Sequence, residues 1–272
     1  MHDSQNSTGF LTTQLISTES LIDGVPNFDF EVTGEDAFTE DDIEIPENLM
    51  LGKRAERFFS EWVNRSSSYE LIAENIQVIE NKQTLGEFDF MVRRIEDGQL
   101  IHIELIYKFY LFDPTVQGSE FEKWIGPNQG DRLDFKRDKL ANHQFPLMYT
   151  QAAKDRLLEL GIDSTNIEQQ VLFLANLFVP FNGEVDFIEV NKEAVQGVWM
   201  RLEDWKKRST SSDQFAIPEK KDWFSRELKN ARWLSREDAL LEIESLHGKK
   251  KSPLVWKRNE DGNQFKEFVV WW

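Results

Sequence analysis

The stretch that decides the fold is EFDFMVRRIEDGQLIHIELIYKFYLF, residues 87–112. It contains two runs in which apolar residues alternate with polar ones, separated by the pair Asp97-Gly98. An Asp-Gly pair between two alternating runs is typical of the two-residue turn of a β-hairpin. We therefore predict two antiparallel strands that are joined at Asp97-Gly98.

The register of that hairpin brings three charged residues together. A two-residue turn places Asp89 opposite Ile106, which makes Asp89 the diagonal neighbour of both Glu104 and Lys108. Because side chains alternate between the two faces of a strand, the two carboxylates and the ammonium share one face. The opposite face is almost wholly apolar, so the pattern predicts a polar cluster on one side of the hairpin.

Such a cluster suits metal-assisted chemistry on phosphate. Two neighbouring carboxylates repel each other, and a hard cation such as Mg²⁺ relieves that repulsion through oxygen ligands. A water on the cation can attack phosphorus, while the metal and Lys108 offset charge on the phosphoryl oxygens. The structural alternative is the solvated face of an amphipathic hairpin, with Glu87 and Lys108 as a surface ion pair. Alternation alone favours that alternative.

The composition of the 272-residue chain excludes several kinds of site. The chain has no cysteine, which excludes a disulfide scaffold, a thiolate metal site and cysteine catalysis. No apolar run approaches the roughly 20 residues of a membrane-spanning helix, and the first residues do not resemble a secretory signal. We expect a cytoplasmic protein with no membrane association, either one large core with an appendage or two modest domains.

The negative charge is concentrated at one end of the chain. The formal net charge is −17, and residues 1–50 contain 12 Asp or Glu and no Lys or Arg. An acidic total disfavours broad, non-specific binding to nucleic acid. We expect residues 1–50 to form a solubilising, partly disordered acidic arm. The alternatives are that this arm fills a basic groove in place of nucleic acid, or that it recruits a basic partner.

Periodicity predicts an α/β core followed by a smaller α+β region. The core elements are expected in the order α-β-β-β-α-β, with a second helix before the last strand. They are a helix from Leu51, a short strand at 76–79, the hairpin, helices at about 131–144 and 146–160, and a buried strand at 170–179. Beyond the core we expect a strand at 195–205, a helix capped by Ser235, and a second hairpin in 254–272 that turns at Asp261-Gly262.

Four strings carry a family resemblance: LGKRAERFF (51–59), TLGEFDF (84–90), HIELIYKFYLF (102–112) and WIGPNQGDRL (124–133). Together they are similar to the bacterial family known as domain of unknown function 1853. That family resembles the PD-(D/E)XK nuclease superfamily, whose core is a central mixed sheet flanked by helices. The resemblance implies an α/β protein with an acidic arm at 1–50, a PD-(D/E)XK (restriction-endonuclease-like) core at 51–182, and a C-terminal α+β extension at 183–272.

The resemblance also implies roles for individual residues. Asp89 and Glu104 match the superfamily's metal-binding acids, and Glu56 matches a glutamate that is often found on the first helix. Gln144 and Tyr149 resemble a Gln-and-Tyr substrate motif, with a spacing one residue longer than in that motif. The alternatives are a boundary glutamate for Glu56 and a structural glutamine for Gln144.

The lysines fit the superfamily pattern less well. The pattern places a lysine two residues after the second acid, where this chain has Ile106, and Lys108 follows two residues later. Lys136 belongs to a group of basic residues that could line a phosphate path, although nearby aspartates offset their charge, which favours a solvated helix. His102 shares the polar face, and a structural role is expected for it.

Two functions follow as hypotheses. The first is a nuclease that hydrolyses phosphodiesters of DNA or RNA with Mg²⁺ or Mn²⁺, with Asp89, Glu104 and Glu56 as metal ligands and Lys108 as the charge-stabilising residue. The second is a catalytically inactive protein of the same fold that binds nucleic acid or protein, a hypothesis motivated by the displaced Lys108. The sequence does not fix the oligomeric state.

Overall fold

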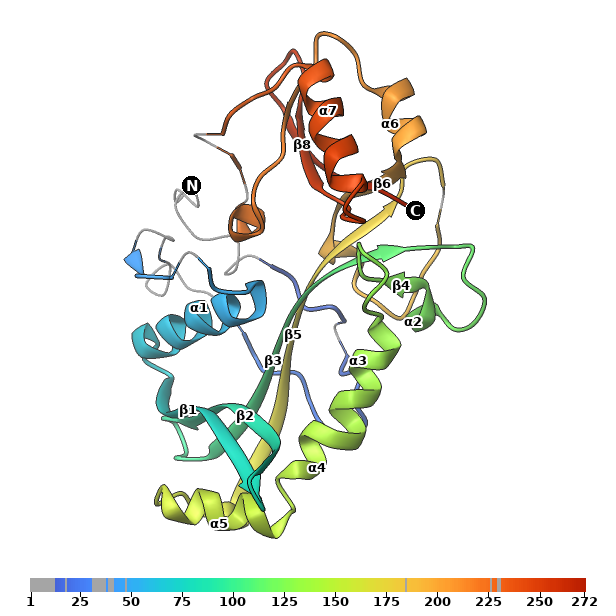
Figure 1. Ribbon diagram of the computed structural model, residues 1–272. Coiled ribbons are helices and arrows are strands. Elements are labelled where there is room, and N and C mark those ends of the chain that lie inside the picture. The colour runs from blue at the N-terminus through green and yellow to red at the C-terminus, as the bar shows by residue number, and fades with distance from the viewer. Residues whose placement is uncertain are drawn as a thin grey trace. The chain divides into compact units, whose positions relative to one another are not determined.

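The computed structural model describes residues 13–17, 19–30, 38, 42–46, 48–183, 185–225, 227–228 and 231–272. In this part of the chain, nine strands form a mixed sheet and helices accompany it, so the protein belongs to the α/β class (Figure 1). The strand order is β1-β2-β3-β5-β6-β9-β8-β7, and β4 pairs with β3. No helix within the described ranges is long and apolar enough to cross a membrane.

The chain divides into two compact units. The first comprises Met1–Tyr107 and Phe135–Leu174, and the second comprises Lys108–Asp134 and Ala175–Trp272. Both β3 (Leu100–Phe112) and β5 (Ile167–Pro180) contribute residues to each unit. The sequence analysis placed domain boundaries near residues 50 and 182. Periodicity along the chain cannot show that one long strand contributes residues to two compact units.

The first unit starts with a helix that packs through aromatic rings. Helix α1 (Leu51–Arg65) buries the apolar stripe that predicted it, and Phe59 lies edge-on to Phe90 with ring centroids 4.7 Å apart. The strands β1 (Tyr69–Glu80) and β2 (Gln83–Arg94) form an antiparallel pair. Strand β1 is longer than expected because it pairs with β2 along nearly its whole length.

The hairpin between β2 and β3 is confirmed, but its predicted register is wrong. Five residues, 95–99, connect the strands. Gly98 N–H donates to the Arg94 carbonyl, and the Asp97 carboxylate accepts from both Gln99 N–H and the Arg94 side chain. These bonds close a longer loop than the predicted two-residue turn. The pairing therefore shifts by two residues, and Met91 lies opposite His102 rather than Glu104.

A long helical run follows in the first unit. Helix α3 (Leu133–Lys139), the π-helical turn η4 (Leu140–Gln144) and helix α4 (Phe145–Leu147) are continuous, and α5 (Gln151–Glu159) begins after a break capped by Thr150. Pro146 lies in the first turn of α4, as expected, but no break precedes it, and the expected second helix is instead divided between α4 and α5. Side chains of α4 and α5 pack on those of β1 and β2, including Leu147, Leu157, Val78 and Phe88.

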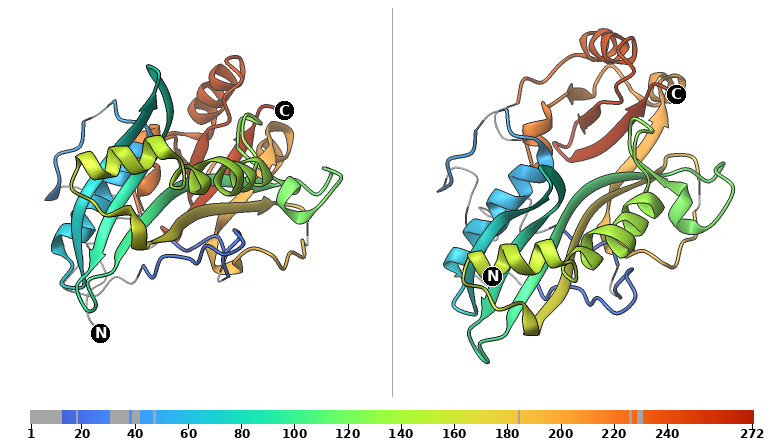
Figure 2. Two further views of the ribbon diagram at one scale, coloured as in Figure 1. Left: turned by 90° about the horizontal axis from the view of Figure 1, so that it is seen from below. Right: turned by 60° about the horizontal axis from the view of Figure 1, so that its bottom comes forward.

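The described part of the acidic arm is fixed to β5. Ile16 N–H donates to the Phe173 carbonyl and Phe28 N–H to the Val171 carbonyl. The Phe28 ring is fully buried and lies edge-on to Trp62. Figure 2 shows the described arm, in blue, running alongside β5. These described arm residues pack in the first unit, while residues 1–12, 18, 31–37, 39–41 and 47 of the arm lie outside the described ranges.

The second unit contains the remaining sheet and its helices. The predicted hairpin that turns at Asp261-Gly262 is confirmed, and so is the helix capped by Ser235, whose side chain accepts from Asp238 N–H. The predicted strand at 195–205 ends early, because Trp205 is buried from a helix instead. The helices and strands of the second unit are α2 (Glu120–Lys123), β4 (Trp124–Ile125), β6 (Val195–Arg201), α6 (Leu202–Arg208), β7 (Gln214–Ala216), α7 (Arg236–His247), β8 (Leu254–Arg258) and β9 (Gln264–Val270). Two 3-10 turns, Lys192–Ala194 and Lys220–Phe224, also belong to this unit, and a third, Ser164–Asn166, belongs to the first unit.

Close approach of two strands makes a glycine necessary in the second unit. A Cβ added to Gly197 in β6 would lie 2.1 Å from the backbone oxygen of Lys266 in β9. We predict that Gly197→Ala lowers the free energy of unfolding by about 1–3 kcal/mol, measured by urea unfolding followed through tryptophan fluorescence. Gly52→Ala in α1 is the control, because no atom lies within 4 Å of its added Cβ. Equal stability of the two variants would contradict this account.

Candidate active site

Asp89 lies where the β2–β3 pairing ends. The last paired residues are Phe90 and Ile103, and one residue further along β2 the Asp89 Oδ2 atom accepts from Leu105 N–H at 3.0 Å. The Asp89 carboxylate thus accepts from an N–H of β3 in place of a backbone carbonyl of β2. Burial raises the pKa of Asp89 to about 7, and the neighbouring Glu104 carboxylate contributes to that rise. The carboxyl groups of Asp89 and Glu104 are therefore close enough to repel each other.

Glu104 is fully buried in the middle of β3. Its Oε1 atom lies 3.0 Å from His102 Nε2, and its Oε2 atom accepts from the side-chain amide of Gln144 in the π-helical turn. Burial raises the pKa of Glu104 to about 8. The hairpin face with Glu104 is therefore not a solvated surface, and the structural alternative drawn from alternation is wrong at this residue.

His102 holds Glu104 from the same strand. Burial lowers the pKa of His102 to about 4, so the ring is neutral at pH 7. The Gln169 amide nitrogen lies 3.3 Å from His102 Nδ1, and an amide N–H can only donate. The ring proton is consequently assigned to Nε2, which donates to Glu104. Phe88 and Phe145 lie edge-on to the ring and fix its plane.

Glu56 and a lysine that the sequence analysis did not single out complete the group. Lys53 Nζ lies 2.7 Å from Glu56 Oε2, 2.8 Å from Glu87 Oε1 and 2.7 Å from Asn75 Oδ1. Burial raises the pKa of Glu56 to about 7, and Asp89 adds to that rise. Although burial alone would lower the pKa of Lys53, its hydrogen bonds to Glu56 and Glu87 raise it.

Lys108 takes part in a different contact from the predicted one. It belongs to the second unit, where its amine lies 2.6 Å from Asp131 Oδ2. The expected ion pair between Glu87 and Lys108 is wrong, because Glu87 pairs with Lys53 instead. The lysine that acts electrostatically on Asp89 is Lys53, which opposes the rise in its pKa.

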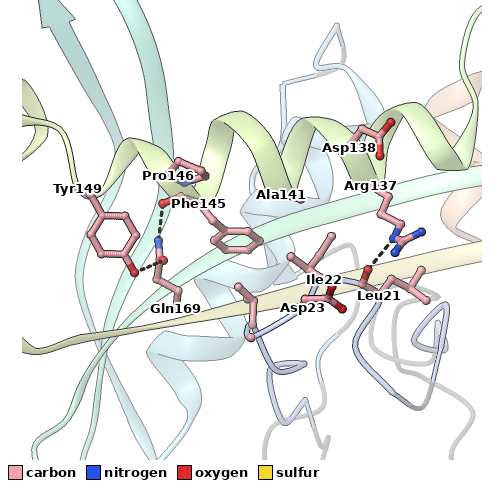
Figure 3. A pocket seen from close by; sticks show the side chains of 12 residues that line it. Leu21, Ile22, Asp23, Arg137, Asp138, Ala141, Phe145, Pro146, Tyr149 and Gln169 are labelled. Atoms are coloured by element: carbon pink, nitrogen blue, oxygen red, sulfur yellow. Dashed lines mark hydrogen bonds between the residues drawn. The ribbon is translucent and has the colours of Figure 1, made fainter.

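Of the three expected substrate residues, Gln144 and Lys136 lie together and Tyr149 lies apart. Lys136 Nζ lies 3.4 Å from the Gln144 side-chain oxygen, which places it behind Gln144 relative to Glu104. Tyr149 is 71% exposed, and its hydroxyl donates to Gln169 at 3.2 Å. It lines a pocket of about 480 Å³ with residues 21–25 and the helical run. Figure 3 shows Tyr149 at one end of this pocket and Arg137, bonded to the Leu21 carbonyl, near the other.

The sequence contains a partial signal for the missed residues. Lys53 precedes Glu56 by three positions, which places both on one side of a helix. Asn75 and Gln169 had no such signal, because each meets its partner through the tertiary fold.

The donor set suits a hard cation only in part. Carboxylate oxygens from Asp89, Glu104 and Glu56 are the kind of ligand that Mg²⁺ prefers. In the described residues, however, no group of three or more His, Cys, Asp or Glu side chains is arranged to hold a metal ion. A site built from these residues would use two carboxylates and leave the other positions to water, which is common for Mg²⁺.

Comparison with known proteins places the chain in a family. Residues 31–270 match the family model described as Domain of unknown function (DUF1853). A search of the curated proteins and a search of the solved structures each give no match. The matched range extends from the arm to the last strand and includes the whole carboxylate cluster, and the family predicted from the four sequence strings is confirmed. The chain therefore belongs to the DUF1853 family.

Proposed function

We propose that this protein is a metal-dependent nuclease with a PD-(D/E)XK-like core, in which Asp89 and Glu104 hold one Mg²⁺ or Mn²⁺ ion. A single observation carries the proposal. Two carboxyl groups on adjacent strands lie within electrostatic reach of each other, and each has a pKa near or above neutrality. A bound divalent cation would relieve that repulsion and restore both groups to the ionised state.

The surroundings of the two carboxylates support a ligand role. Metal-binding side chains are usually held by hydrogen bonds from further residues, which fix their orientation. Leu105 N–H holds Asp89, while His102 and Gln144 hold Glu104. Two buried acids with no ligand role would cost more free energy than well-packed apolar residues in their place, even when donors satisfy their oxygens.

The reaction proposed is hydrolysis of a phosphodiester. A water oxygen attacks phosphorus, the bond from phosphorus to the leaving oxygen breaks, and the leaving oxygen takes up a proton. The metal ion would supply Lewis-acid activation of that water and of the phosphoryl oxygen. Glu56 adds a third carboxylate at the edge of the cluster, and Gln144, backed by Lys136, keeps Glu104 in place. Tyr149 takes no part in this arrangement.

The alternative is a protein that kept the fold and lost the chemistry. One observation favours it: Lys108, the residue expected to stabilise charge, pairs with Asp131. In that case the protein would act as a binding module for nucleic acid or for another protein. The two functions differ in one measurable property, the binding of a divalent cation by Asp89 and Glu104.

The raised pKa values predict how stability depends on pH. Asp89, Glu56 and Glu104 bind protons more tightly in the folded state, so their contribution to stability is present at low pH and is lost as pH rises toward 8. His102 has the opposite effect, but only below about pH 6.5. We therefore expect the free energy of unfolding to fall by about 1–3 kcal/mol between pH 6.5 and pH 8.

Divalent cations provide the matching test by thermal melting. Millimolar Mg²⁺ or Mn²⁺ should recover part of the stability lost at pH 8 in the wild type. The double variant Asp89→Asn, Glu104→Gln should show a flatter pH profile and no response to the cation. A wild type whose melting temperature ignores both pH and cation in this range would contradict the ligand assignment.

Cleavage tests the proposed function itself. Single- and double-stranded DNA and RNA are incubated with the purified protein in Mg²⁺ or Mn²⁺, and products are separated on a gel. Asp89→Asn and Glu104→Gln should each lower the rate at least about 100-fold, because each removes a metal ligand. Glu80→Gln, an exposed carboxylate at the end of β1, should cleave like the wild type. No cleavage by the wild type with any of these substrates would leave the binding-module alternative.

A further inference from the structure

We infer that Lys53 is the phosphate-binding cation of this site, and that the side-chain oxygen of Asn75 occupies the position of a phosphoryl oxygen when no substrate is bound. The inference deepens the proposed function, since it names the residue that receives the substrate's phosphate at the same cluster. It stands on the contacts of Lys53, which are independent of whether a metal ion binds.

The ammonium group of Lys53 has three N–H donors and three oxygen acceptors. The acceptors are Glu56 Oε2 at 2.7 Å, Glu87 Oε1 at 2.8 Å and Asn75 Oδ1 at 2.7 Å. Two of them are carboxylates, whereas the Asn75 amide is neutral. A carboxylate attracts the ammonium through a full negative charge, which the neutral amide lacks. An incoming phosphoryl oxygen would therefore replace Asn75 and leave the two carboxylate contacts intact.

Exposure points to the same exchange. The side chains of Glu56 and Glu87 are 12% and 28% exposed, which places them on the buried side of the ammonium. The Lys53 side chain is 39% exposed, and Asn75 lies at the surface of β1. Solvent, and any ligand that arrives from solvent, therefore reaches Lys53 from the side that Asn75 now occupies.

The backbone at Asn75 is held in an unusual conformation. Its φ angle is 55°, in the left-handed region that few residues other than glycine adopt, although asparagine tolerates it. Such conformations cost free energy and occur often at functional sites. The side chain directed by this backbone bonds to Lys53. The conformation thus sets a weak, replaceable acceptor beside the ammonium.

Lys53 is also placed where its charge is useful. It acts electrostatically on Asp89, one of the two proposed metal ligands. In phosphodiester hydrolysis, negative charge grows on the phosphoryl oxygens, and a fixed cation next to them lowers the barrier. Lys108 does not fill that role, because its amine pairs with Asp131.

A purely structural role for Lys53 makes different predictions. In that case the ammonium would only hold α1 against the β1–β2 hairpin through its bonds to Glu56, Glu87 and Asn75. Asn75→Asp would then replace a neutral acceptor of the ammonium by a carboxylate, which stabilises the protein and leaves phosphate binding unchanged. If Asn75 instead occupies the phosphate position, the same substitution places a permanent competitor there and weakens binding while the protein stays equally stable or becomes more stable.

The test measures binding without metal or cleavage. A fluorescent single-stranded DNA oligonucleotide is titrated with protein at pH 7 in EDTA and low salt, and anisotropy is recorded. Lys53→Gln and Asn75→Asp should each weaken binding about tenfold or more. Lys108→Gln, a matched loss of one lysine charge, should bind like the wild type.

The outcomes separate this inference from the proposed function. The inference is overturned if the folded Lys53→Gln and Asn75→Asp proteins bind the oligonucleotide as tightly as the wild type does. It is also overturned if the wild type does not bind. In both cases, metal-dependent cleavage by the wild type would still support the proposed nuclease. Loss of binding in both variants, without cleavage by the wild type in any metal, supports Lys53 as the phosphate contact and removes the nuclease. If Lys53→Gln does not fold, as judged by its melting curve, Asn75→Asp decides alone.

Discussion

The burial of one carboxyl group, that of Glu104, constrains the arrangement of the first unit. A carboxyl group without solvent at the centre of a sheet is costly unless donors satisfy its oxygens. Here one donor comes from His102, two residues earlier on the same strand, and the other from Gln144 on the helical run. Gln169 on β5 in turn fixes the proton on His102. Strand, helix and neighbouring strand are thus tied to a single side chain.

The π-helical turn is the local feature that meets this constraint. A π turn inserts one extra residue into a helix and rotates the side chains that follow, and such turns occur often at functional sites. In this chain the turn ends at Gln144, whose amide reaches Glu104, and the next residues, Phe145 and Leu147, are buried. The turn therefore allows one helix to present a polar residue to the carboxylate and apolar residues to the core.

The sequence was sufficient for the elements whose signal is local. The α1 stripe, the β2–β3 hairpin, the β5 run and the Ser235 cap depend on neighbours within a few positions, and all four are observed. The register of the hairpin was not predictable in this way, because Arg94 pairs with Asp97 and extends the connection to five residues. A two-residue error is small, yet it decides whether Asp89 meets Ile106 or Glu104.

The sequence brought the two acids of the proposed site together, but it did not point to the proposed cation, Lys53. Asp89 and Glu104 lie on paired strands, so alternation and the family strings were enough to bring them together. The contact of Lys53 with Asn75 joins a helix to a strand 22 positions later through a left-handed backbone, which no spacing rule foresees. The two glutamates that hold Lys53 were each visible in the sequence, but nothing indicated that they share one ammonium.

The role proposed for Lys53 has a physical explanation in the burial of β3. The PD-(D/E)XK pattern, if it applied to this chain as proposed, would place an ammonium at Ile106, on the same face as Glu104 and only 3% exposed. An ammonium there would be buried beside the sheet core, and its hydration would have to be replaced entirely by Glu104 and its donors, which are already bonded to one another. A lysine on α1 avoids that cost, because 39% of its side chain remains exposed while its amine still acts on Asp89. Where a strand is buried this deeply, a lysine on a neighbouring surface helix loses less hydration free energy in reaching the carboxylates than a lysine on the strand itself would lose.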